Sequence, residues 1–476
     1  MKRIRCGWLG TASLFMSLGV VLSGCSSMAP AYERPVPTMP ATFALAGDAG
    51  PRAAELGWQA FFTDPALRRV LAQAQAHNHD LRLAVLRVQE ARAALGIQRA
   101  DRLPTVAASA EATRARVPHD LNLTGHSLLG NQFQAGVGFS TWEIDLWGRV
   151  ASLNEAALQS YLATDAARRG VELSVLAQTA QAWLALRESD ERLALARRTA
   201  ANREQSLRIF RRREALGATS RLELTQVELL WQQAQALVSQ LALTRATQAH
   251  ALALLTGEQV PEPLVAESVD DLAPVAVVQA GLPSELLLNR PDIVAAEHAL
   301  RAAHANIGAA RAAFFPRIAL TASYGSASAE LDGLFQVGSA AWTFVPSIGL
   351  PLFDGGRREA ALDLATVRRE QAVVRYEQAV EGAFRDVADA LAARHWLAEQ
   401  VRTLDAMKTV QAERARLAKL RYDSGATRYL EVLDAERDLM SVEQQWVQAR
   451  RAQWSAQVAL YAALGGGALL PLSVTE

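Results

Sequence analysis

The chain is poor in the residues that build disulfide scaffolds and metal sites. Its 476 residues include two cysteines, eight histidines and six methionines. Cys6 lies in an N-terminal segment that we expect to be removed, so the mature chain would keep only Cys25 and could form no intramolecular disulfide. His77 and His79 form the tightest histidine cluster, but residues two apart on a helix point to different faces. We therefore expect no metal site and no cofactor.

Charge of one sign and long apolar runs are also missing. Forty-nine basic residues balance 49 acidic ones, which gives no reason to expect nucleic-acid binding. After the N-terminal segment there is no unbroken run of about 18 apolar residues, so a helical membrane span is not expected. A chain of this kind could cross a membrane only as strands. Motifs of hydrolases, phosphate-binding loops and zinc proteases are also absent, so we expect neither catalytic residues nor an enzyme.

The N-terminus carries an export signal. Lys2, Arg3 and Arg5 precede an apolar stretch over 8–22, which is the pattern of a secretory signal peptide. The stretch ends in LSGC, which resembles the lipobox of bacterial lipoproteins, and this resemblance implies cleavage before Cys25 and a covalent lipid on its thiol. The following serine, Ser26, favours export to the outer membrane. We therefore predict a signal peptide over 1–24 and a lipid-anchored extension over 25–59.

The rest of the chain repeats itself. Gly148-Arg149 and Gly217-Ala218-Thr219 recur, at one constant spacing, as Gly356-Arg357 and Gly425-Ala426-Thr427. Such a period indicates a duplicated unit, which we place at 60–255 and 284–464. The intervening segment 256–283 contains four prolines and has the composition of a linker. A C-terminal tail follows over 465–476.

Each unit is predicted to contain a helix, two strands, a long helix, a turn and a last helix. The first helices are expected over 65–102 and 283–313, because both stretches are rich in strong helix formers and are followed by proline. The strands are expected at 104–114 and 131–143 in the first unit, and at 316–327 and 341–353 in the second.

The strand segments alternate in polarity with period two. Ile318, Leu320 and Tyr324 alternate with small or polar residues, as in a strand of an outer-membrane barrel. A half-buried strand of a soluble sheet shows the same alternation. Four strands cannot close a barrel, and open edges are costly in lipid, so a spanning sheet must be completed by further copies of the chain. This argument requires an oligomer without fixing the number of copies.

The long helices are expected at 149–216 and 357–424, because neither stretch contains a proline. A helix of that length spans about 100 Å and suggests a coiled coil or a tunnel wall. Apolar residues at spacings of three and four, such as Val380, Phe384, Val387 and Leu391, support this interpretation. A glycine after each helix suits a left-handed cap and a turn into an antiparallel helix.

Together these features resemble the TolC/OprM type of outer-membrane efflux protein, and its lipoprotein branch in particular. The most specific matches are WEIDLWGR at 142–149, LFDGGR at 352–357 and RYDSGATRYLEVLDAER at 421–437. The resemblance implies a mainly α fold with a transmembrane β-barrel portion: a homotrimer whose 12-stranded barrel continues into a 12-helix periplasmic tunnel. It also implies a periplasmic adaptor, an inner-membrane transporter of the resistance-nodulation-division class, and a passive conduit for exported small molecules.

The same resemblance assigns roles to the helix tips. The turns Gly217-Ala218-Thr219 and Gly425-Ala426-Thr427 would contact the adaptor, although both glycines also read as ordinary helix caps.

A gate is implied in the second unit. Leu430 would supply an apolar ring and Asp434 an acidic ring, with Arg421, Tyr422 and Arg437 in the polar links that hold the tunnel shut. Three carboxylates around an axis attract cations and disfavour anions. Asp434 and Arg437 are also spaced as an ordinary surface ion pair on a helix. In the first unit Gln226 occupies the position of Asp434, so an acidic ring there comes from the second unit alone.

Two other functions fit parts of the sequence. A type I protein-secretion tunnel would share the fold, and a lipid-anchored coiled-coil scaffold would share the helices without a pore. The exported substrate is not encoded in a recognisable motif.

Overall fold

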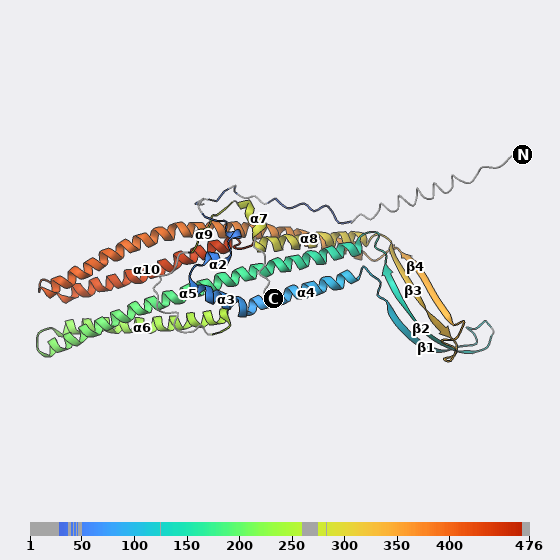
Figure 1. The fold of residues 1–476 in the computed structure, drawn as a ribbon, viewed down its shortest axis with the longest axis horizontal. Helices are drawn as coiled ribbons and strands as arrows, with labels where there is room; N and C mark the ends of the chain where they lie inside the picture. Colours follow the sequence, from blue (N-terminus) through green and yellow to red (C-terminus); the bar gives the residue numbers. More distant parts are fainter. Residues whose placement is uncertain are drawn as a thin grey trace. The chain divides into compact units, whose positions relative to one another are not determined.

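The computed structural model describes residues 28–36, 40, 42–43, 45, 50–123, 125–258, 275–281 and 283–468. The expected signal peptide, Cys25, most of the proline-rich segment and the end of the C-terminal tail lie outside these residues. The chain forms long helices and one sheet (Figure 1), which confirms a mainly α fold with a strand portion. Among the described residues, no helix is long and apolar enough to cross a membrane.

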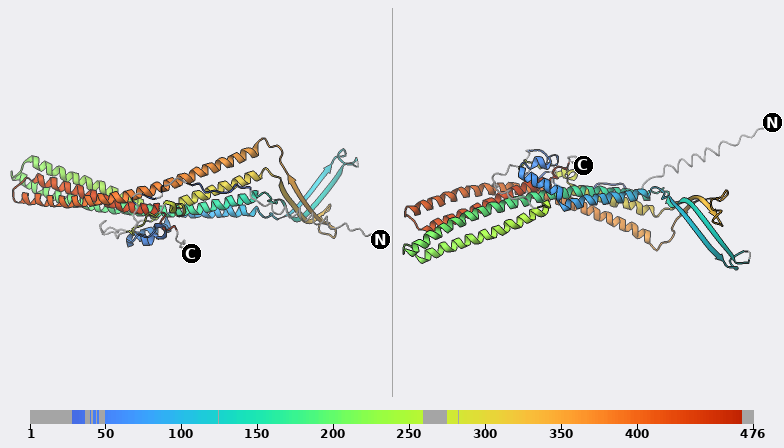
Figure 2. Two further views of the ribbon diagram at one scale, coloured as in Figure 1. Left: turned by 90° about the horizontal axis from the view of Figure 1, so that it is seen from above. Right: turned by 60° about the horizontal axis from the view of Figure 1, so that its bottom comes forward.

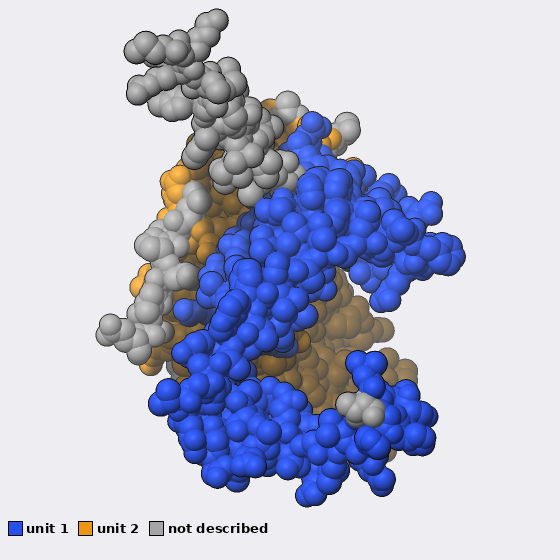
Figure 3. All heavy atoms as spheres, turned by 90° about the vertical axis from the view of Figure 1, so that its right-hand side faces the viewer, with its two compact units in different colours: residues 1–35, 88–164, 296–376 blue, residues 36–87, 165–295, 377–476 orange. Residues whose placement is uncertain are grey.

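The chain divides into two compact units, which Figure 3 distinguishes by colour. Unit 1 contains residues 1–35, 88–164 and 296–376, and unit 2 contains residues 36–87, 165–295 and 377–476. The units do not coincide with the sequence repeats, because each takes segments from both halves of the chain. All strands belong to unit 1, and both turns between long helices belong to unit 2.

The first helix of each repeat is interrupted, which the sequence did not predict. In the first repeat α3 (Pro65–His77) ends at Asn78 and α4 (His79–Ala100) follows. The Asn78 side chain accepts hydrogen bonds from the backbone amides of Asp80 and Leu81 at 2.9 and 3.1 Å, so it caps the new helix.

The second repeat has its interruption at Arg290. A short 3-10 turn, η3 (Pro283–Glu285), and α7 (Leu286–Asn289) precede α8 (Pro291–Ala312). Arg290 is extended, with ψ of 121°, because the following residue is a proline.

The four strands form one antiparallel sheet in the order β1-β2-β3-β4. They are β1 (Ala107–Val117), β2 (Leu128–Glu143), β3 (Arg317–Ser328) and β4 (Ala340–Gly349). The first strand begins three residues later than expected, because its pairing with β2 starts at Ala107 opposite Gly138. A break in the β2–β3 register between Phe139 and Trp142 shifts the end of β2 by one residue.

Two helical hairpins form most of unit 2, although residues 149–164 and 357–376 of their long helices belong to unit 1. The long helices α5 (Arg149–Ala215) and α9 (Arg357–Asp423) each contain 67 residues, and each is followed by an antiparallel helix, α6 (Arg221–Thr256) or α10 (Tyr429–Ala463). Figures 1 and 2 show α6 beside α5 and α10 beside α9.

Residues 51–62 and 275–281 pack beside these helices in unit 2. Residues 53–55 form a 3-10 turn, η1 (Ala53–Glu55), and residues 58–61 form a short helix, α2 (Trp58–Phe61). The Gln279 amide donates to the Pro51 carbonyl, and the Ala276 amide donates to the Phe61 carbonyl. Phe61 is fully buried and stacks on Tyr461 of α10, with ring centroids 4.1 Å apart. Residues 275–281 are thus bonded to the fold, unlike a free linker.

Candidate functional site

The sheet of unit 1 has one apolar face. The strand registers place Trp342 of β4 opposite Tyr324 of β3, which in turn lies opposite Val137 of β2. Phe344, Ala322 and Phe139 are aligned across the same three strands. In the isolated chain this face is uncovered: Trp342, Phe344 and Ile348 are 71%, 59% and 70% exposed. A patch of large apolar side chains in water is unfavourable, so this face requires an apolar environment.

The opposite face is polar or small. Ser323 and Thr343 share a hydrogen bond of 2.7 Å between their hydroxyl groups, and the Gln134 amide donates to Glu111 at 3.2 Å. Gly136, Gly138 and Gly325 lie on the same face or against it and leave it shallow. Over the half of the sheet next to the helices, one face is thus apolar and the other is polar or small.

Both edges of this sheet are open. β1 pairs only with β2, and β4 only with β3, among the residues that the structure describes. Unpaired edge strands present free amide and carbonyl groups along their length.

The strand-to-helix junctions are held by ion pairs and tryptophans. Glu143 accepts from Arg149 and from Arg317, each at 2.8 Å, and so links the end of β2 to α5 and β3. The Trp142 indole donates to the Arg102 carbonyl at 3.2 Å, and Trp147 donates to the Pro316 carbonyl at 2.8 Å. These contacts explain why the motif at 142–149 combines two tryptophans, an acid and an arginine.

The two helix tips of unit 2 have the same turn. Gly217 and Gly425 have φ of 71° and 77°, and the next amide, of Ala218 or Ala426, donates at 2.8 Å to the carbonyl five residues earlier. This is the Schellman pattern, in which glycine is favoured because its φ is positive. Nothing lies within 4 Å of a Cβ placed on either glycine, so conformation alone requires it.

The first tip is closed by its own side chains. Ser220 accepts from the Glu223 amide at 3.2 Å, and Glu223 accepts from the Ser220 amide, which forms a capping box at the start of α6. The Thr219 hydroxyl also donates to Glu223. These two hydrogen bonds, from Thr219 first and then from Ser220, lower the pKa of Glu223. Thr219 is half-buried, whereas Gly217 and Ala218 are exposed.

The second tip lacks such a cap. Arg428 precedes α10 in the position of Ser220, and its side chain makes no cap hydrogen bond. The second tip is held instead by hydrogen bonds to the first hairpin. The Arg213 guanidinium donates to the Tyr422 hydroxyl at 2.5 Å, and Tyr429 shares a hydrogen bond with Ser206. Gly425 and Ala426 are exposed, and Thr427 is half-buried.

The residues predicted for the gate lie along the second tip. Leu430 is 45% exposed, and Asp434 pairs with Arg437 at 3.2 Å within α10. Arg421 reaches Glu431 at 3.4 Å, so it links α9 to α10. The structure thus brings Asp434 and Arg437 together and places Leu430 on the surface of the single chain. Their role as a gate stays a prediction.

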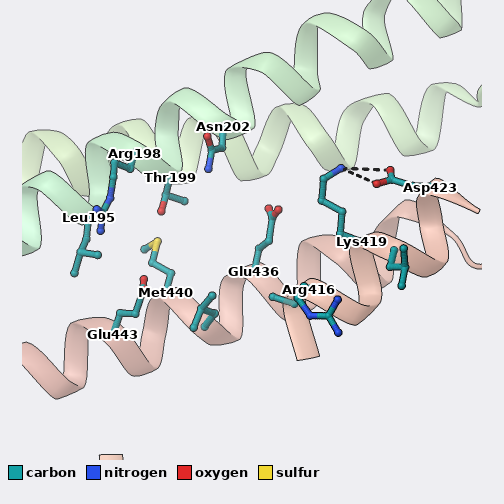
Figure 4. A pocket seen from close by; sticks show the side chains of 13 residues that line it. Leu195, Arg198, Thr199, Asn202, Arg416, Lys419, Asp423, Glu436, Met440 and Glu443 are labelled. Carbon is teal, nitrogen blue, oxygen red and sulfur yellow. Dashed lines mark hydrogen bonds and ion pairs between the residues drawn. The ribbon is translucent and has the colours of Figure 1, made fainter. Parts of the chain in front are cut away.

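A polar cavity, which the sequence did not predict, lies between α5 and the α9–α10 hairpin. It has a volume of about 680 Å³ and is lined by residues of all three helices. In Figure 4, Glu436 and Glu443 of α10 lie across the cavity from Asn202 and Arg198 of α5, while Lys419 pairs with Asp423 at 3.3 Å. Along α5 and α10 the cavity lies between two packed apolar clusters, which contain Leu195 with Val401, Leu404, Trp446, Val447 and Ala449, and Leu433 with Leu207, Phe210, Leu224 and Val227.

Charge in this region is incompletely paired. Burial raises the pKa of Glu436, while the nearby Arg203 and Lys419 oppose the shift without making a hydrogen bond to it among the described residues. Burial also raises the pKa of Glu443, which Arg198 and Lys408 oppose. Arg203 is 5% exposed and its Nε has no partner within the described chain, although its Nη1 donates to the Leu230 carbonyl at 2.8 Å. A buried layer of this kind weakens the packing between hairpins.

In the sequence, this layer of buried charged residues is marked only by the correspondence between the two repeats. Glu436 occupies the position of Glu228, which forms a surface pair with Arg211 at 3.0 Å. No local sequence pattern distinguishes the buried Glu436 from Glu228 at the surface. No group of three or more potential metal ligands occurs in the part of the chain that the structure describes.

Comparison with known proteins places these features in context. The model of the family described as "Outer membrane efflux protein" matches residues 70–258 and 282–466. The toluene efflux pump outer membrane protein TtgF of Pseudomonas putida is 43% identical over 470 residues, which cover 96% of this chain and 97% of that protein. The outer membrane protein OprJ of Pseudomonas aeruginosa is 41% identical over 467 residues and covers 96% of each chain.

A solved channel has the same fold. The open state of the MtrE outer membrane channel of Neisseria gonorrhoeae superposes with a TM-score of 0.86 at 40% identity, covering 93% of this chain and 98% of that one.

Proposed function

The chain belongs to the outer membrane efflux protein family, and from this premise we propose that three copies close one channel through which small molecules leave the periplasm. The chain itself is an outer-membrane efflux component of the channel type. The proposal concerns the number of copies, the pore, the gate, the anchor and the partners.

One observation supports the proposed pore: the chain has a four-stranded sheet with an exposed apolar face, a polar face and two open edges. In lipid, every backbone amide and carbonyl must be paired, so the sheet must close on itself through other copies. Three copies give twelve strands, with the apolar face toward lipid and the face of Ser323 and Thr343 toward water. The alternating strand directions leave β1 and β4 antiparallel to each other, as closure between copies requires.

The helices would extend this pore as a twelve-helix tunnel into the periplasm. Around a threefold axis, Leu430 and Asp434 would form the apolar and acidic rings of a gate, and Arg421, Tyr422 and Arg437 would hold the second tip in its closed position. The exposure of Leu430 in the single chain supports this, because a ring at the axis is covered only when three copies meet.

The turns at 217–219 and 425–427 would meet a periplasmic adaptor, which connects the channel to an inner-membrane transporter. Both turns are exposed and have one geometry, so one adaptor motif could recognise both. A lipid on Cys25 would anchor the chain to the membrane. Relatives are named as components of toluene, solvent and antibiotic pumps, and we propose small, mainly apolar molecules as the cargo here.

Adjacent residues on β4 provide the test. Phe344→Lys places a charge on the apolar face, which in a spanning strand costs about 2–4 kcal/mol at mid-membrane, so the variant should yield few oligomers and little conductance in planar bilayers. Thr343→Lys is the matched control on the polar face. It should assemble normally and shift ion selectivity toward anions. Normal assembly of Phe344→Lys would contradict a lipid-facing role for this face.

A further inference from the structure

The outer strands of the sheet both join helical segments at the same end of the sheet. β1 begins at Ala107, directly after α4, and β4 ends at Gly349, shortly before α9. Our inference rests on the closure proposed above, in which β1 of one copy pairs with β4 of the next. Paired strands lie about 4.8 Å apart, so residues 102–106 of one copy would lie beside residues 350–357 of its neighbour.

The side chains in these two segments are apolar and exposed. Leu103 and Val106 are 70% and 65% exposed, and Leu352 and Phe353 are 88% and 91% exposed. Each seam between copies would therefore be bordered by apolar side chains from both partners.

An arginine lies next to the apolar residues in each of the two segments. Arg102 lies at the end of the α4 segment and Arg357 is the first residue of α9. Neither guanidinium makes a hydrogen bond or ion pair with any residue that the structure describes. Three other arginines at these junctions have carboxylate partners, because Arg149 and Arg317 share Glu143 and Arg358 binds Asp354 at 2.6 Å.

The backbone at Arg102 is fixed on the apolar side. Trp142 pairs in register with Leu320 on the apolar face, and its indole donates to the Arg102 carbonyl at 3.2 Å. Tryptophan and arginine side by side are typical of a membrane–water boundary, where the ring lies among head groups and the guanidinium reaches phosphate.

We propose that Arg102 of one copy and Arg357 of the next form a binding site for the head group of an anionic phospholipid, one at each seam of the trimer. The two guanidinium groups would bind phosphate oxygens through charge-assisted, bidentate hydrogen bonds. The acyl chains would lie against the apolar border formed by Val106 and Leu352. Such a lipid bridges two copies and stabilises the seam.

Native mass spectrometry of the full-length oligomer tests this. The protein is extracted from vesicles that contain equal amounts of phosphatidylglycerol and phosphatidylethanolamine, and retained lipid is counted. The wild type should retain phosphatidylglycerol preferentially, at one molecule per seam. Arg102→Ala with Arg357→Ala should weaken retention roughly 30-fold, given the affinity that each surface arginine contributes. Arg116→Ala, at the far end of the same strand β1, is the matched control and should retain lipid as the wild type does.

A second double variant, with conservative substitutions, keeps the test informative if the alanine variant assembles poorly. Arg102→Lys with Arg357→Lys preserves charge but loses the bidentate geometry, so its retention should lie between those of the wild type and the alanine pair. Equal retention by all variants, or equal retention of both lipids, would overturn the site. Conductance separates this result from the proposed function, because a conducting trimer without lipid preference contradicts only the lipid site.

Discussion

The two helix tips share a backbone turn but differ in what supports them. At both tips a glycine with positive φ closes the long helix with the same pair of backbone hydrogen bonds. The first tip then caps its second helix with Ser220 and Glu223. The second tip has Arg428 in that position and depends on Tyr422 and Tyr429, which bind side chains of the first hairpin.

This difference suggests that the two hairpins have different roles. A tip that is closed by its own cap stays rigid when its neighbours move. A tip that is held through contacts to another hairpin can be released when those contacts break. Tyr429 packs against the apolar cluster that contains Leu433 and Phe210, and the polar cavity beside α10 reaches Asp423, next to Tyr422. The first hairpin would thus be a fixed wall and the second a movable one.

The largest expected effect concerns the gate. Leu430→Ala with Asp434→Ala should raise single-channel conductance in planar bilayers several-fold, because it removes both proposed rings. The matched control changes the same positions of the first tip, Leu222→Ala with Gln226→Ala, and should leave conductance near the wild-type value. Equal effects of the two pairs would remove the distinction between a fixed and a movable hairpin.

A smaller effect should follow from exchanging the caps. Arg428→Ser places serine three residues before Glu431 and completes a capping box at the second tip. A cap contributes about 1 kcal/mol, so amides at the start of α10 should exchange hydrogen more slowly and the channel should open less often. Ser220→Ala should speed exchange at the start of α6 by a similar factor without opening the channel. Unchanged exchange in both variants would show that the caps do not set tip stability.

The smallest effect concerns Glu436 and Glu228, which occupy equivalent positions in the two repeats. Replacing the carboxylate should raise the stability at Glu436 and lower it at Glu228. Because burial raises the pKa of Glu436, the folded tip binds a proton more tightly than the unfolded chain does. The associated stability is therefore fully present below the ordinary pKa of glutamate and is lost as the pH rises through the raised value.

Glu436→Gln should consequently raise the melting temperature at neutral pH, and this gain should disappear toward acidic pH. Glu228→Gln breaks an exposed pair with Arg211, so it should lower stability by at most about 0.5 kcal/mol. Thermal unfolding monitored by circular dichroism at a series of pH values measures both. A gain for Glu436→Gln that persists in acid would contradict the buried-carboxylate explanation.

Sequence patterns located the long elements well because their signals are local. The helices expected at 149–216 and 357–424 span Arg149–Ala215 and Arg357–Asp423, and each ends where a glycine offers a left-handed cap. The apolar alternation of the strands likewise corresponds to one face of the sheet. The helix break at Asn78 was not predicted because the weak helix formers at 77–80 are few and lie between two long runs of strong helix formers. Its side-chain cap is seen only in the structure.

The features around α10 could not be predicted in the same way. The cavity is formed by three helices from distant parts of the chain, and Glu436 is distinguished from Glu228 only by what packs over it. The absence of a cap at the second tip is visible in the sequence as Arg428 in place of Ser220. Its importance follows only from the contacts of Tyr422 and Tyr429 with the first hairpin.

We propose that one chain is a third of a channel, closed through β1 and β4. Cysteine cross-linking between these edges tests it directly, with Ala108→Cys or Ala110→Cys combined with Ile348→Cys or Phe344→Cys. Within one chain the two edges are three strand spacings apart, about 14 Å, which is too far for a disulfide. Oxidised products on denaturing gels should extend to trimers and stop there. Monomers for every combination, or a ladder that continues beyond three, would contradict it.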